Sequence, residues 1–157
     1  MVSVAIKPAY DDLDAVRELF SEYVTLLGLE LDFQDYDAEF AGLPGKYAPP
    51  FGRLYLAWSD GSPCGCIALR RFDVRRCELK RMFVRPEFRG RGIGGALVRT
   101  LIDDAKAIGY AEMILDSFFS MESAIVLYRK FGFAEIAPYY ENPYPDVVYL
   151  GLLLETL

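Results

Sequence analysis

A glycine- and arginine-rich loop near the middle of the chain carries the residues best suited to bind an anion. Its sequence is Arg89-Gly90-Arg91-Gly92-Ile93-Gly94-Gly95, and it follows an apolar run that ends at Val84. Apolar residues then recur at helical spacing from Ile93 to Ile108, so the loop opens a helix. The first N–H groups of a helix lack partners within it, glycines expose the backbone, and arginines suit phosphate. The pattern therefore predicts a pyrophosphate-binding loop.

The rest of the composition limits the chemistry available to the chain. It contains no histidine and three cysteines, Cys64, Cys66 and Cys77. An odd number of cysteines favours free thiols over a disulfide framework, and Cys64 and Cys66 cannot complete a zinc site without histidine. We therefore expect no metal. Any proton transfer must use a carboxylate, a tyrosine, a lysine, a cysteine or water.

Charge is distributed unevenly along the chain, whose net charge is −6. Residues 70–91 hold nine Lys/Arg and three Asp/Glu, whereas the remainder of the chain holds eight Lys/Arg and twenty Asp/Glu. Such an acidic remainder would repel a polyanion, so we expect a small anionic cofactor and no nucleic acid. Residues 11–39 carry ten carboxylates and one arginine. They suit a cationic co-substrate, although a solvated helix face explains most of them better.

Length and hydropathy predict one domain over residues 1–157 in a cytoplasmic protein. Hydrophobic residues make up 53% of the 157 residues, which is enough for one core. The apolar runs are shorter than the roughly 20 residues that cross a bilayer, so no membrane association is expected. The N-terminal residues lack the features of a signal peptide.

Hydrophobic periodicity and turn residues predict an α/β (α+β) fold with a mixed sheet flanked by helices. Antiparallel strands come first and parallel crossovers follow in the middle of the chain. The predicted strands are 2–7, 53–58, 64–72, 77–84, 112–116, 133–136 and 147–154. The predicted helices are 12–27, 35–43, 93–108 and 121–131.

The glycines also satisfy a dinucleotide-binding pattern, Gly90-x-Gly92-x-x-Gly95, and Asp116 stands where a ribose-binding acid would be expected. Two features count against this hypothesis. Residues 85–89 separate the strand from the first glycine, and antiparallel hairpins open the sheet. A Walker-type loop is excluded because no Lys-Ser/Thr pair follows the glycines.

Residues 78–94 resemble the acyl-CoA-binding motif of the GNAT superfamily of N-acetyltransferases, Gln/Arg-x-x-Gly-x-Gly/Ala. Arg89, Gly92 and Gly94 match that motif, and residues 127–133 resemble a second family marker, a helix with a tyrosine followed by a Gly-Phe pair. The order of predicted elements fits the family along the whole chain. The resemblance implies a single acyl-CoA N-acyltransferase domain whose central parallel strand pair is splayed.

The resemblance further implies acetyl-CoA as co-substrate. Its pantetheine arm would pair with the backbone of one strand, and its pyrophosphate would meet the amides of the loop. Many family members carry an asparagine where this chain has Met121, so that contact is absent or is replaced by Ser120 or Ser123. The residues expected to bind acetyl-CoA are Met82, Phe83, Val84, Arg89, Gly90, Arg91, Gly92, Ile93, Gly94 and Gly95.

Two residues are candidates for catalysis. Glu78 lies eleven residues before Arg89, where the resemblance implies a general base in some members; the alternative is a structural pair with Lys80 or Arg81. Tyr128 suits a core position by periodicity, but the resemblance implies a hydrogen bond to the CoA sulfur and protonation of the thiolate. A backbone N–H near Phe83 or Val84 would polarise the thioester carbonyl.

We therefore expect an N-acetyltransferase that moves acetyl from acetyl-CoA to a primary amine of a small molecule, or of a protein, in a ternary complex. Without an activating histidine, a covalent acyl-cysteine is not favoured. A non-catalytic acyl-CoA sensor and a nicotinamide-nucleotide-binding module are the alternatives, and a homodimer is one oligomeric option that the resemblance implies. Aromatic residues expected to wall the acceptor pocket, or to cover the core, are Phe118, Phe119, Tyr139, Tyr140 and Tyr144.

Overall fold

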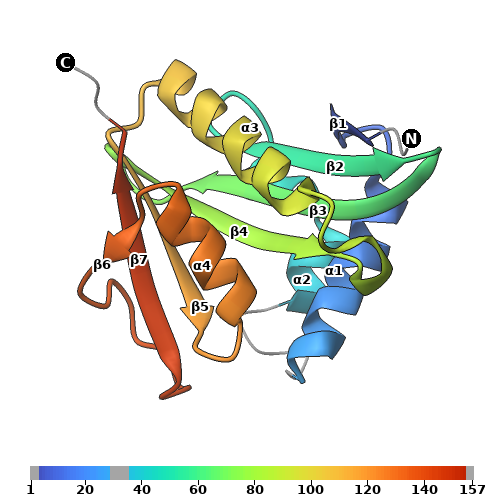
Figure 1. Cartoon of the computed structure of the whole chain (residues 1–157). Helices are drawn as coiled ribbons and strands as arrows, with labels where there is room; N and C mark the ends of the chain where they lie inside the picture. The colour runs from blue at the N-terminus through green and yellow to red at the C-terminus, as the bar shows by residue number, and fades with distance from the viewer. Residues whose placement is uncertain (1–3, 29–35, 155–157) are drawn as a thin grey trace.

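The computed structural model describes residues 4–28 and 36–154, which form a seven-stranded sheet with helices on both faces (Figure 1). The strand order is β1-β2-β3-β4-β5-β7-β6. The strands are β1 (Val4–Pro8), β2 (Arg53–Ser59), β3 (Ser62–Arg71), β4 (Arg76–Val84), β5 (Glu112–Phe118), β6 (Ala134–Glu135) and β7 (Val147–Leu153). The helices are α1 (Leu13–Leu27), α2 (Tyr36–Ala41), α3 (Ile93–Ile108) and α4 (Glu122–Lys130), with short 3-10 turns η2 (Gly45–Tyr47) and η3 (Pro86–Phe88).

The mixed sheet predicted from the sequence is confirmed. Strands β1 to β4 pair antiparallel, β4 and β5 pair parallel, and β7 pairs antiparallel with both β5 and β6. The predicted strand 133–136 is shorter than expected, because only residues 134 and 135 pair with β7. The predicted starts at Val2 and Asp35 lie outside the described residues.

Each long helix buries one apolar stripe, as its sequence pattern predicts. Val16, Leu19 and Phe20 are buried on α1, which ends at Gly28 in the left-handed conformation. The α3 stripe includes Leu97 and Leu101, both fully buried. No helix in the described ranges is both long enough and apolar enough to cross a bilayer.

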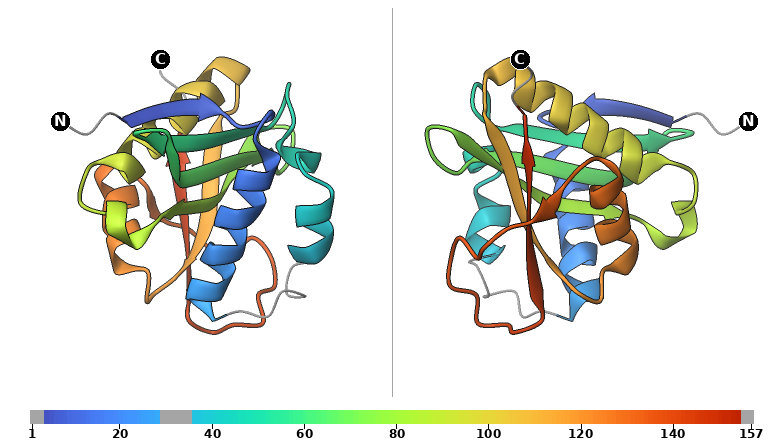
Figure 2. Two further views of the ribbon diagram at one scale, coloured as in Figure 1. Left: turned by 90° about the vertical axis from the view of Figure 1, so that its right-hand side faces the viewer. Right: turned by 60° about the vertical axis from the view of Figure 1, so that its left-hand side comes forward.

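The sheet separates two hydrophobic cores. One lies under α3 and α4, and the other lies between the sheet and α1 (Figure 2). Ile67 and Leu69 of β3 face the first core, whereas Cys66 and Ala68 face the second, because alternate side chains point to opposite faces. All three cysteines are free and fully buried in these cores. In the described part of the chain, no group of three or more His, Cys, Asp or Glu side chains could hold a metal ion.

The parallel pair β4–β5 opens after three residues. Pairing joins Arg76–Glu78 to residues 112–114, and β4 then continues beside β3 while β5 continues beside β7. The register of β3 with β4 also shifts between Cys66 and Ala68, a bulge at which Arg81 has a φ of 58°. The divergence leaves a gap between the second halves of β4 and β5 (Figure 1).

Candidate active site

A groove of about 590 Å³ runs along the end of β4, between the glycine loop and α4. We call it the cofactor groove. Nine of the ten residues predicted to bind acetyl-CoA line it: Met82, Phe83, Val84, Arg89, Gly90, Gly92, Ile93, Gly94 and Gly95. The tenth, Arg91, is not part of the lining, and its guanidinium carbon lies 5.3 Å from the centre of the Phe88 ring.

The glycine loop presents backbone to this groove. Gly90 and Gly92 have φ values of 78° and 77°, a conformation that disfavours side chains, and a Cβ at either position would meet no atom within 4 Å. The first α3 hydrogen bond runs from the Ala96 N–H to the Gly92 carbonyl, so the preceding amides have no acceptor within the helix. A Cβ on Gly94 would lie 3.2 Å from Leu127, so Gly94 lets α3 and α4 approach closely. The loop can therefore receive an anion on its main chain.

The side of the groove formed by α4 supplies polar groups that the glycine motif does not reveal. Ser120 and Ser123, considered as substitutes for the usual asparagine, both line the groove together with Met121. Lys130, in the last turn of α4, lines it as well and adds a second positive charge to that of Arg89. The sequence did not indicate that Lys130 would line this groove, because a lysine in the last turn of a helix is common.

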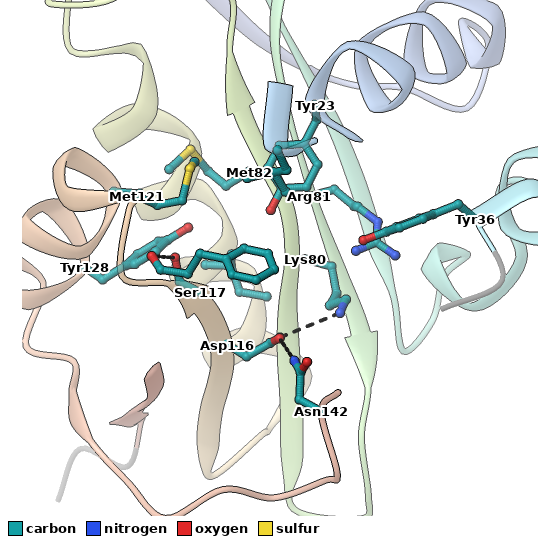
Figure 3. A pocket seen from close by; sticks show the side chains of 14 residues that line it. Tyr23, Tyr36, Lys80, Arg81, Met82, Asp116, Ser117, Met121, Tyr128 and Asn142 are labelled. Carbon is teal, nitrogen blue, oxygen red and sulfur yellow. Dashed lines mark hydrogen bonds and ion pairs between the residues drawn. The ribbon is translucent and has the colours of Figure 1, made fainter. Parts of the chain in front are cut away.

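A second, much smaller cavity of about 40 Å³ lies where β4 and β5 diverge. We call it the acceptor pocket (Figure 3). It is lined by Tyr23, Leu27, Tyr36, Leu79, Lys80, Arg81, Met82, Asp116, Ser117, Phe118, Met121, Ala124, Tyr128 and Asn142. Met82, Met121 and Ala124 also line the cofactor groove, so the two cavities meet at these residues.

Tyr128 is placed at this junction. The side chain is 5% exposed, its ring packs 5.7 Å from the ring of Phe133, and its hydroxyl points into the acceptor pocket (Figure 3). Burial raises the pKa of this hydroxyl well above its ordinary value, so the proton is retained at neutral pH. No group in residues 4–28 and 36–154 forms a hydrogen bond with it, which leaves the proton available to a ligand.

Glu78 lies away from both cavities, within the paired part of β4. Its buried carboxylate accepts hydrogen bonds from Arg70 Nε at 2.8 Å and from the Tyr139 hydroxyl at 2.7 Å, and Lys80 Nζ lies 3.9 Å away. Burial alone would raise the pKa of this carboxyl, but Lys80, Arg70 and the hydrogen bonds lower it below its ordinary value. Of the two structural partners considered from the sequence, Lys80 is present at ion-pair distance, but the hydrogen-bonding partners are Arg70 and Tyr139, which the sequence did not indicate. The role of Glu78 as a base stays a prediction.

Arg81, the other partner considered for Glu78, binds a different carboxylate. Its Nε and Nη2 atoms lie 3.0 and 2.9 Å from the two oxygens of Glu39, and its guanidinium stacks 4.5 Å above the Tyr36 ring. Glu39 also accepts a hydrogen bond from the Tyr47 hydroxyl at 3.0 Å. This ion pair links α2 to the bulge of β4. It stabilises the left-handed backbone conformation of Arg81 at that bulge.

The aromatic residues near the C-terminus divide between pocket and core. Phe118 lines the acceptor pocket, and the Tyr144 ring packs 5.4 Å from it. Tyr139 and Tyr140 pack against Tyr149, and their hydroxyls donate hydrogen bonds to Glu78 and Asp116. Phe119 lines neither cavity and is 56% exposed.

Comparisons with known proteins identify the family to which the chain is similar. A family model described as the acetyltransferase (GNAT) family matches residues 13–133. An uncharacterised N-acetyltransferase of Schizosaccharomyces pombe is 39% identical over 153 residues, which cover 96% of this chain and 94% of that protein.

Two solved structures have a similar fold. An acetyltransferase of the GNAT family from Staphylococcus aureus Mu50 gives a TM-score of 0.83 at 21% identity, covering 98% of this chain and 100% of that one. A Salmonella typhimurium protein solved with its cofactor acetyl-CoA gives a TM-score of 0.77 at 22% identity, covering 97% of this chain and 94% of that one. At these identities the likeness concerns the fold alone.

Proposed function

The chain belongs to the GNAT family of acetyltransferases, and we propose that it transfers acetyl from acetyl-CoA to a primary amine of a small molecule. One observation carries this proposal. The cofactor groove and the acceptor pocket meet at Met82, Met121 and Ala124, beside the Tyr128 hydroxyl. A ligand in the groove and a second ligand in the pocket would therefore come together at a group able to give a proton.

The groove suits the two polar parts of acetyl-CoA. The open left-handed glycines and the unpartnered amides at the start of α3 suit its pyrophosphate, with Arg89 and Lys130 adding positive charge. The Arg85 N–H donates to the Cys64 carbonyl of β3 at 2.8 Å. Since successive N–H groups of a strand point to opposite sides, the Val84 N–H points away from β3, toward the gap. That N–H is available to the amide chain or the thioester of the ligand.

Acetyl-CoA, when bound, supplies the acetyl group as a thioester. Tyr128 holds its proton at Oη and is proposed to hydrogen-bond the departing sulfur and protonate it. The attacking amine gives up its proton to water, and Tyr128 regains a proton from water. The backbone N–H of Val84 polarises the carbonyl as charge develops on its oxygen. All three cysteines are fully buried in the two cores, and burial raises the pKa of the Cys66 thiol, which favours direct transfer over an acyl-cysteine.

The nicotinamide alternative loses support from the sheet. Among the described strands, β4 and β5 form the one parallel pair, whereas the dinucleotide fingerprint belongs to several consecutive parallel βα units. Asp116 lies in the acceptor pocket and not beside the glycine loop.

The test uses the purified chain, acetyl-CoA and a panel of primary amines, with release of the CoA thiol and the mass of the product as readouts. We expect amine-dependent thiol release and thermal stabilisation by acetyl-CoA but not by NAD. Stabilisation by acetyl-CoA without turnover of any amine would instead indicate a sensor.

A further inference from the structure

Among the described residues that line the acceptor pocket, Asp116 is the one carboxylate, and it takes no part in the steps above. It lies on β5 two residues beyond Ile114, the last β5 residue paired with β4. Its side chain is 14% exposed, whereas that of Glu78, in the part of β4 still paired with β5, is 1% exposed. Because the two strands separate beyond Ile114, the carboxylate of Asp116 reaches the pocket, whereas that of Glu78 stays buried outside it.

The two oxygens of Asp116 have different surroundings. Oδ2 accepts a hydrogen bond from the Tyr140 hydroxyl at 2.6 Å and a longer one from Asn142 Nδ2 at 3.5 Å. Oδ1 lies 3.8 Å from Lys80 Nζ, which is an ion-pair distance but too long for a hydrogen bond. Within the described ranges Oδ1 accepts no hydrogen bond, so it retains its capacity to bind a donor.

The other charges at the pocket already have partners. Arg81 is bound by both oxygens of Glu39, and Lys80 lies between Asp116 and Glu78. An anionic group on the acceptor would have to displace one of these carboxylates. A cationic group could bind Asp116 Oδ1 directly, with the aromatic residues Tyr23 and Phe118 on the same lining.

We propose that Asp116 Oδ1 binds the ammonium group of the acceptor, which loses a proton to water before it attacks as the neutral amine, and that the pocket selects primary amines carried on an unbranched carbon. The cavity of about 40 Å³ has room for only a few water-sized groups, which suits an amino group and its adjacent methylene. Asp116 is thus a specificity-determining residue, and Tyr140 and Lys80 are the positioning residues that hold its carboxylate. The inference names the acceptor of the proposed transfer and rests on that function.

The experiment compares Asp116→Asn with Asp103→Asn, which removes the same charge from an exposed position on α3. Both variants and the wild type are assayed with acetyl-CoA and a matched series of amines: linear, branched at the α-carbon, and secondary. Thermal unfolding and the dissociation constant of acetyl-CoA are measured for each protein, so that a folding defect is recognised. Asp116→Glu, which keeps the charge, is the rescue variant.

We expect Asp116→Asn to raise the KM for linear amines by about ten- to a hundredfold, because a hydrogen bond to a charged group is lost. The KM for acetyl-CoA should stay within about twofold, Asp103→Asn should behave as the wild type, and Asp116→Glu should recover part of the affinity. The wild type should prefer linear to branched or secondary amines. Equal amine KM values for Asp116→Asn and Asp103→Asn, or equal use of branched amines by the wild type, would overturn the proposal. Failure of the wild type to acetylate any amine would instead reject the transferase function itself.

Discussion

The cofactor groove and the acceptor pocket meet at the same strand but are constructed in opposite ways. The groove takes much of its lining from one continuous segment, 82–95, whose glycines expose the backbone, with α4 opposite. The pocket uses large side chains from α1, α2, β4, β5, α4 and the loop after β6. Its volume is about 40 Å³, against about 590 Å³ for the groove.

This difference has a physical basis. A pyrophosphate and an amide chain can be bound by N–H groups, which every residue except proline has, so conformation matters more than side-chain identity. A particular amine is distinguished by charge, shape and hydrogen-bonding groups, which only side chains supply. Substitutions should therefore affect the groove through backbone conformation and the pocket through lost charges and hydroxyls.

Tyr128 belongs to the junction, and its loss should have the largest effect on turnover. Tyr128→Phe removes the hydroxyl and keeps the ring against Phe133. We expect kcat to fall by about 10²- to 10⁴-fold, because general acid catalysis contributes on this scale, with little change in the affinity for acetyl-CoA. Steady-state kinetics and calorimetric binding measure the two quantities. An unchanged kcat between pH 6 and pH 9 would remove Tyr128 from the chemistry.

Arg81 tests the dependence of the pocket on buried charge. Arg81→Met leaves Glu39 without its bidentate partner, and breaking a buried pair on one side costs about 3–5 kcal/mol. The free energy of unfolding in urea should fall by this order. Arg89→Met is the matched control in the groove, where we expect weaker acetyl-CoA binding with little loss of stability. Equal stability losses in the two variants would contradict the distinction between pocket and groove.

Substitution of Glu78 distinguishes a structural role for this carboxylate from a role as the catalytic base. Glu78→Gln loses the charge-assisted bonds to Arg70 and Tyr139, so we expect about 1.5–3 kcal/mol less stability at pH 7 and a smaller loss of turnover. Because the pKa of Glu78 is lowered from its ordinary value of 4.5, its stabilising contribution is complete above that value and is lost as the pH falls through the lower folded pKa. The stability difference between wild type and variant should therefore shrink in acid. A large loss of turnover with unchanged stability would support the base instead.

Substitution of Gly92 tests how the groove depends on backbone conformation, and it should change stability or acetyl-CoA affinity by the smallest amount of the four. Gly92→Ala places a Cβ in open space but on a backbone with a φ of 77°, which costs about 1–2 kcal/mol. Stability or acetyl-CoA affinity should fall by this amount while the KM for the amine is retained. Gly95→Ala is the control for the stability measurement alone, because Gly95 also lines the groove; it lies inside α3, and its Cβ would only touch Leu127 at 3.8 Å. It should stabilise the helix slightly, and an effect equal to that of Gly92→Ala would show that conformation is not the cause.

The sequence pattern predicted the groove well because its parts are adjacent along the chain. A strand, a glycine loop and a helix stripe can be recognised within residues 77–108, and Gly90 and Gly92 have the conformations that favour glycine. Among the predicted cofactor residues, Arg91 is the one that does not line the groove, because its side chain turns onto Phe88. Lys130 was not indicated, since its approach depends on the packing of α4 against α3.

The acceptor pocket was much less predictable. Its tyrosines and charges are separated by up to 105 residues, from Tyr23 to Tyr128, and amphipathic spacing alone makes these two tyrosines ordinary core residues. Whether Glu78 or Asp116 opens to the pocket depends on where β4 and β5 separate, which no local pattern encodes. The neighbours Lys80 and Arg81 suggested partners for Glu78, but the β-bulge sends Arg81 to Glu39 on the side of α2.

The sequence by itself therefore determined the order of the elements, the class of sheet and the anion-binding loop, because hydrophobic periodicity and glycine conformation act over short distances. The tertiary structure decided which carboxylate lines the pocket. Strand divergence, burial and pairing of charges arise only when residues distant in the chain pack together. The same glycine loop thus determines the cofactor site locally, and the acceptor site beside it depends on the whole fold.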